Sequence, residues 1–146
     1  MKALLLAFFA LILSCQELPK EYRGEEGKKK MEKYGKQFVY GVVRLDEEVK
    51  DKVPDGDYFL ILALRNPQEP QPIAVLRVKN PKFPYRFRIT SKNKIREDRL
   101  IEGEVLLSAR ISRSPMAEAQ KGDLVGAVLT RAGEREVEVL ISQEVK

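Results

Sequence analysis

Few side chains in this chain of 146 residues have the types and spacing that catalysis needs. Histidine is absent, which excludes Ser–His and Cys–His nucleophile systems and every zinc, blue-copper or haem site with a histidine ligand. Acidic pairs such as Glu25–Glu26 and Glu47–Glu48 lie in polar segments, where no general acid or base is favoured. The sequence also lacks a glycine-rich phosphate-binding loop. We therefore expect no enzymatic activity, no metal site and no cofactor.

The one cysteine, Cys15, directly follows an apolar segment. Lys2 precedes the apolar run Ala3–Leu13, which is shorter than the about 20 residues of a membrane-spanning helix but typical of a secretory signal. The run Ile12-Leu13-Ser14-Cys15 resembles the lipobox of bacterial lipoproteins, in which the cysteine thiol is acylated after cleavage of the signal. The resemblance implies a signal peptide over residues 1–14 and lipidation of Cys15. The alternatives are a free or buried thiol, or an ordinary signal with an accidental cysteine.

A lipidated cysteine would fix where the protein acts. Three acyl chains exceed the two signals needed for stable anchoring, so a membrane surface is one expected partner. By resemblance, Gln16 favours the periplasmic leaflet of the outer membrane, because lipoproteins retained in the inner membrane carry an aspartate there. Export excludes nucleic acid as a partner. The net charge of +5 suits anionic lipid, an acidic protein or a propionate-bearing ligand, or simply a solvated surface.

The segment after the signal is polar, with a mixed run of charges. It has too few apolar residues to offset the entropy of ordering, so we expect a flexible linker over residues 15–36. A short helix across Glu25 to Tyr34 is the alternative. Met31 and Tyr34 alone do not define a buried face for it.

From Gln37 onward the sequence changes to short alternating apolar runs, separated by Gly and Pro. The expected strands are 38–45, 57–65, 72–79, 84–90, 104–112, 124–130 and 136–142. No long segment has the 3.6-residue period of a helix. The pattern predicts an all-β fold, a single β-sandwich of about seven strands over residues 37–146.

One expected strand has apolar side chains on both faces. One face carries Phe59, Ile61 and Ala63. The other face carries Tyr58, Leu60, Leu62 and Leu64. A sandwich buries only one face of each sheet, so one set is in excess. Either a loop or the linker covers the outer face, or this second set forms an exposed apolar patch that binds a partner.

Basic side chains supply further candidate binding residues. Arg86 and Arg88 lie in the densest basic region of the sequence. Arg110 and Arg113 have the guanidinium geometry to receive the carboxylate of a peptide C-terminus or of haem. Asp123 is able to pair with either of them or to accept N–H bonds in a turn. The alternatives are a solvated face for the first pair and a structural ion pair for the others.

Several segments, in this order along the chain, resemble a known family. They are Gly41–Leu45, Val53–Pro54, Phe59–Arg65, Pro72–Val75, Phe83–Pro84, Phe87, Ala109–Arg113 and Lys121–Gly126. Together they are similar to the C-terminal Ig-like domain of the CycH-type cytochrome c biogenesis proteins. The successive motifs ARISR and GDLxG are the most specific part. The resemblance implies an Ig-like sandwich and a place in the System I haem-attachment pathway, where such proteins help to deliver apocytochrome c to the haem lyase.

The sequence also departs from that family. Its members usually carry transmembrane helices and a tetratricopeptide region, which is credited with holding the apocytochrome, and neither is evident here. Ser114-Pro115-Met116 replaces a glycine that usually follows Arg113 closely. The resemblance implies a non-catalytic accessory module whose partners are apocytochrome c or haem-lyase components. The alternative is a structural or envelope-interaction lipoprotein that shares only the sandwich.

Overall fold

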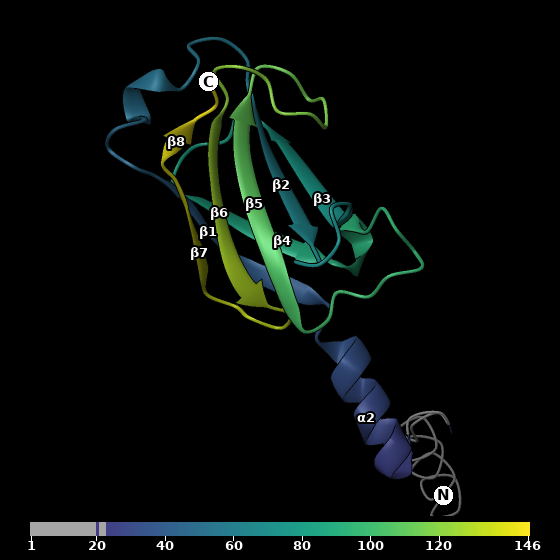
Figure 1. The fold of residues 1–146 in the computed structure, drawn as a ribbon. Helices are drawn as coiled ribbons and strands as arrows, with labels where there is room; N and C mark the ends of the chain where they lie inside the picture. The colour runs from purple at the N-terminus through teal and green to yellow at the C-terminus, as the bar shows by residue number, and fades with distance from the viewer. Residues whose placement is uncertain (1–19, 21–22) are drawn as a thin grey trace, which may run out of the picture. The chain divides into compact units, whose positions relative to one another are not determined.

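The computed structural model describes residue 20 and residues 23–146 (Figure 1). The expected signal segment, residues 1–14, and Cys15 lie outside the described residues. The chain divides into two compact units, with the boundary between Gly35 and Lys36. Within the described residues, no helix combines the length and the apolar character needed to cross a membrane.

The first unit contains helix α2 (Gly24–Gly35). Glu25 and Glu26 lie in its first turn, where negative charge interacts favourably with the helix dipole. The same two glutamates precede Lys29 and Lys30 by four residues, a spacing that stabilises exposed helices. The second half of the expected linker is therefore helical, which is the alternative that the sequence leaves open.

The second unit is a two-sheet β-sandwich, as predicted (Figure 1). Its strands are β1 (Phe38–Leu45), β2 (Phe59–Arg65), β3 (Pro72–Lys79), β4 (Tyr85–Thr90), β5 (Glu104–Ser112), β6 (Leu124–Arg131), β7 (Val137–Ile141) and β8 (Gln143–Glu144). One sheet has the order β4-β1-β7 and the other the order β3-β2-β5-β6-β8. The pair β1–β7 is parallel and the other pairs are antiparallel. Two 3₁₀ turns, η2 (Lys50–Lys52) and η3 (Ser91–Asn93), lie in the connections.

The core lies between the two sheets and follows the alternation of the strands. The three-stranded sheet contributes Val39, Val43, Phe87, Ile89, Val139 and Ile141. The five-stranded sheet contributes Leu60, Leu62, Leu64, Leu107, Ala109 and Ile111. Burying one large aliphatic side chain contributes about 1.5–3 kcal/mol, so this inner layer supplies most of the stabilisation of the fold.

The prediction of an exposed patch on β2 is wrong. Leu60, Leu62 and Leu64 are 0% exposed and belong to the core. Tyr58 is only partly exposed, and its hydroxyl donates a hydrogen bond of 2.6 Å to the carbonyl oxygen of Pro81. The leucines face inward because the register aligns them with inner side chains of both neighbouring strands; Leu62, for example, lies opposite Leu76 and Ala109.

Two glycines allow β7 to approach its neighbours closely, Gly126 between the two sheets and Gly41 within the three-stranded sheet. A Cβ on Gly126 of β6 would lie 2.0 Å from the carbonyl oxygen of Leu140 in β7. A Cβ on Gly41 of β1 would lie 1.9 Å from the carbonyl oxygen of Val137. Only a residue without a side chain fits at these contacts. They fix where β7 crosses its neighbours.

Candidate functional site

The loop between β5 and β6 covers part of the outer face of the five-stranded sheet. Ile61 points outward from β2, opposite Arg77 and Arg110, yet it is only 5% exposed. Arg77 Nε donates to the carbonyl oxygen of Pro115 at 3.2 Å. Arg110 Nη2 donates to the carbonyl oxygen of Met116 at 2.6 Å. A loop therefore covers the excess apolar face, which is one of the two alternatives drawn from the sequence.

Arg110 and Asp123 are held inside the chain. Arg110 Nη1 lies 2.8 Å from Asp123 Oδ2, and both side chains are buried. The same carboxylate oxygen accepts a hydrogen bond of 2.8 Å from the backbone N–H of Gln120. Arg110 also donates to the carbonyl oxygen of Ala117 at 3.2 Å. The structure therefore shows the structural ion pair, in which each side chain neutralises the charge of the other.

Arg113 lines a cavity of about 400 Å³ where β5 ends and β6 begins. We call this cavity the basic pocket. Its lining residues are Lys52, Pro54, Ile111, Ser112, Arg113, Ser114, Gln120, Lys121, Gly122 and Asp123. In the described part of the chain, neither Arg113 nor Lys121 forms a salt bridge. Unpaired cations beside serine and amide groups are able to bind a carboxylate or another small anion.

Lys52 on the wall of the basic pocket already has an acidic partner. Its Nζ lies 2.8 Å from Glu144 Oε2 in β8. The hydrogen bond and the charge of Glu144 raise the pKa of Lys52, and the same hydrogen bond and the charge of Lys52 lower the pKa of Glu144. Lys52 thus joins η2 to the short strand β8, and Arg113 and Lys121 are the lining cations without a salt bridge in the described chain.

Arg86 and Arg88 lie elsewhere, exposed on β4 in the three-stranded sheet. The Arg88 guanidinium lies 4.6 Å from the ring centroid of its cross-strand neighbour Tyr40, a cation–π contact. Tyr40 stacks on Phe38 with ring centroids 4.5 Å apart, and Arg135 covers Phe38 at 4.7 Å. The structure therefore does not bring this pair together with Arg113, which belongs to the end of the other sheet.

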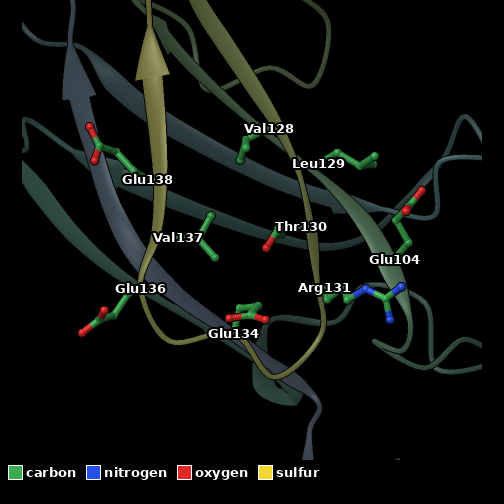
Figure 2. A pocket seen from close by; sticks show the side chains of 9 residues that line it. All are labelled: Glu104, Val128, Leu129, Thr130, Arg131, Glu134, Glu136, Val137 and Glu138. Carbon is green, nitrogen blue, oxygen red and sulfur yellow. The ribbon is translucent and has the colours of Figure 1, made fainter.

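Sequence reasoning missed the aromatic partners of Arg88 and a groove between β6 and β7. The alternation that places Phe38 and Tyr40 on one face was a usable signal for the first. No pattern in the sequence indicates the groove, because it is formed by two strands of different sheets. Its volume is about 370 Å³, and its lining residues are Glu104, Val128, Leu129, Thr130, Arg131, Glu134, Glu136, Val137 and Glu138 (Figure 2).

The fold and these surfaces define an Ig-like β-sandwich with charged sites at its strand ends. The family model for the Ig-like domain of cytochrome c-type biogenesis protein H matches residues 39–142, which is more than half of the chain. The chain belongs to this family, as the resemblance predicted. This membership links it to cytochrome c biogenesis.

The chain is also similar to a bacterial protein along nearly all of the given sequence. A protein of Aquifex aeolicus (strain VF5), described as an uncharacterized protein, is 52% identical over 143 residues. The alignment covers 98% of this chain and 95% of the relative. No solved structure matches the chain.

Proposed function

We propose that the protein is a membrane-anchored, periplasmic accessory module of c-type cytochrome biogenesis, without catalytic activity, that binds apocytochrome c or another assembly component. The family match over residues 39–142 carries this proposal, because it includes nearly the whole sandwich and not one motif. The absence of histidine supports a binding role over a catalytic one.

The basic pocket is the surface that we assign to this partner. It presents Arg113 and Lys121 without acidic partners in the described chain, beside the hydroxyl groups of Ser112 and Ser114. A partner with an exposed carboxylate, such as a polypeptide C-terminus, fits this chemistry because guanidinium binds carboxylate through two hydrogen bonds. Arg86 and Arg88, which face solvent on the other sheet, are a second contact region in the same proposal.

Deletion of the gene in its host tests the function. We expect a lower level of c-type cytochromes, measured by haem staining of membrane and periplasmic proteins after electrophoresis. Complementation with the Arg113→Glu/Lys121→Glu variant should fail to restore them. Complementation with Lys82→Glu, an exposed charge reversal outside the pocket, should restore them. Normal cytochrome levels in the deletion strain would contradict the proposal.

The anchor is tested separately. We propose lipidation at Cys15 and attachment to the periplasmic face of the outer membrane. Growth with a radioactive fatty acid should label the wild-type protein and leave a Cys15→Ser variant unlabelled. Separation of inner and outer membranes on a density gradient then locates the labelled protein. An unlabelled wild-type protein would exclude the anchor, whatever the cytochrome assay shows.

A further inference from the structure

Strand β6 has an edge that is only partly covered. On one side β6 pairs with β5 along its whole length, but on the other side β8 pairs only with Leu124 and Val125. The N–H of Ser142 donates to the carbonyl oxygen of Val125 at 3.1 Å on this second side. The N–H of Ala132 donates to Gly103 at 2.9 Å on the β5 side. The backbone N–H and C=O groups of the odd-numbered residues of β6 therefore point away from β5.

This alternation leaves the backbone groups of Ala127 and Leu129 facing an open edge. Among the described residues, no strand pairs with them on that side. The side chain of Leu129 is 53% exposed, although it is large and apolar. An exposed edge with free N–H and C=O groups is a template for another strand. The short strand β8 covers this edge only at its beginning.

The open edge borders the groove between β6 and β7. Figure 2 shows Thr130 on β6 and Val137 on β7 at facing sides of the gap, with Glu134 at the end closed by the turn between the two strands. At the opposite end the strands meet where Gly126 contacts the backbone of Leu140. The groove thus offers three apolar side chains, Val128, Leu129 and Val137, near the unpaired backbone groups of β6.

The rim of this groove is acidic in a chain whose net charge is +5. Its carboxylates belong to Glu104, Glu134, Glu136 and Glu138. Among the described residues of the lining, Arg131 alone is basic. Glu138 pairs with Arg44 at 3.4 Å, and no salt bridge within the described chain involves the other three. Charges within about 8–10 Å of a ligand act on it at physiological salt, so the rim attracts cationic side chains.

We propose that the edge of β6 at Ala127 and Leu129 binds an extended peptide segment that carries lysine or arginine, by adding it as a strand. The free backbone groups supply the hydrogen bonds, Leu129 packs against an apolar side chain of the peptide, and the rim carboxylates select for positive charge. This inference goes beyond the proposed function, because it names the strand and the chemistry of the bound segment and holds whatever pathway supplies it.

The experiment uses the full chain in mild detergent and a fluorescein-labelled peptide that alternates Val and Thr with interspersed Lys. Fluorescence anisotropy should report binding of this peptide, and a matched peptide with Glu in place of Lys should bind at least about tenfold more weakly. Binding should also slow amide hydrogen exchange in β6. Equal affinity for the two peptides, or no binding of either, overturns the proposal.

Two variants with matched controls locate the site. Leu129→Pro removes the edge N–H and should abolish binding, whereas Leu129→Ala keeps this N–H, loses only the apolar contact and should weaken binding without abolishing it. Glu104→Lys/Glu134→Lys/Glu136→Lys should weaken binding by about tenfold. Glu118→Lys, a charge reversal outside the groove, should leave it unchanged. An equal loss with Glu118→Lys indicates unspecific attraction and contradicts the proposal. So does self-association of the chain through this edge without peptide binding, measured by sedimentation.

Discussion

The guanidinium of Arg110 and the carboxylate of Asp123 lie 2.8 Å apart, with side-chain exposures of 10% and 5%. The pair joins the end of β5 to the start of β6, and the loop between them is bound by further hydrogen bonds from Arg110 to Met116 and Ala117. These two residues stand in the ARISR and GDLxG motifs. The spacing of the motifs therefore has a physical cause, since the β5–β6 register must place the two side chains within hydrogen-bonding distance.

Removing one member of this pair should strongly destabilise the sandwich. We expect Asp123→Asn or Arg110→Met to lower the free energy of unfolding by about 3–5 kcal/mol, because each leaves a buried group without its charged partner. Urea denaturation followed by circular dichroism measures the loss. The double variant should lose less than the sum of the two single variants. A loss below about 1 kcal/mol for each single variant would mean that solvent compensates the remaining charge.

Gly126→Ala should also destabilise the protein, through a steric clash. The added Cβ would lie 2.0 Å from the carbonyl oxygen of Leu140, and backbone atoms cannot move away cheaply. We expect a loss of at least about 1–3 kcal/mol, measured as a lower urea midpoint. Gly56→Ala is the matched control, because no atom lies within 4 Å of a Cβ there. Equal effects of the two substitutions would count against this crossing of β6 and β7.

Two leucine-to-alanine variants test which face of the five-stranded sheet is buried. Leu62 is fully buried between the sheets, so Leu62→Ala should lower the free energy of unfolding by about 2–5 kcal/mol. Leu129 is half-exposed on the outer face, so Leu129→Ala should change the free energy of unfolding by no more than about 0.5 kcal/mol. The same denaturation series measures both. A reversed order of the two losses would restore the interpretation of the β2 leucines as a surface patch.

The positions of the strands could be predicted from the sequence, because the alternation of apolar and polar residues and the turn residues between the strands are local signals. Every expected strand is present, and the ends differ by at most two residues. The face of β2 that is buried was not predictable, since both faces of Phe59–Arg65 are apolar. The inner face is set by register with β3 and β5, and the outer position of Ile61 is covered by a loop distant in the sequence. Local hydrophobicity carries neither piece of information.

The candidate sites were also only partly predictable from the sequence. Arg113 was identified from its residue type, but Lys52 and Lys121, which complete the basic pocket, come from separate connections. Likewise, Arg86 and Arg88 were identified, while Arg135, which covers the same aromatic pair from the β6–β7 connection, was not. The sequence gives the chemical type of each side chain, but its neighbours in space depend on which strands become adjacent.

The Lys52–Glu144 contact predicts how stability changes with pH. The pKa of Glu144 is lowered below its ordinary value of 4.5 by the hydrogen bond and charge of Lys52, with a smaller effect of Lys146. Its contribution is therefore present above pH 4.5 and lost as the pH falls through the lower, folded-state pKa. The pKa of Lys52 is raised above 10.5, mainly by Glu144 and slightly by Glu48, so the contribution is present below pH 10.5 and is lost as the pH rises through the higher, folded-state pKa.

The Glu144→Gln variant isolates this contribution. The wild-type protein should melt at a higher temperature than Glu144→Gln at neutral pH, and the difference should shrink in strong acid, where the Glu144 carboxylate takes up a proton. Melting temperatures from circular dichroism across the pH range measure it. Glu118→Gln, which replaces a carboxylate without a salt bridge in the described chain, is the control and should show no such convergence. If the wild type and Glu144→Gln instead keep a constant difference into strong acid, the contact acts through packing and not through charge.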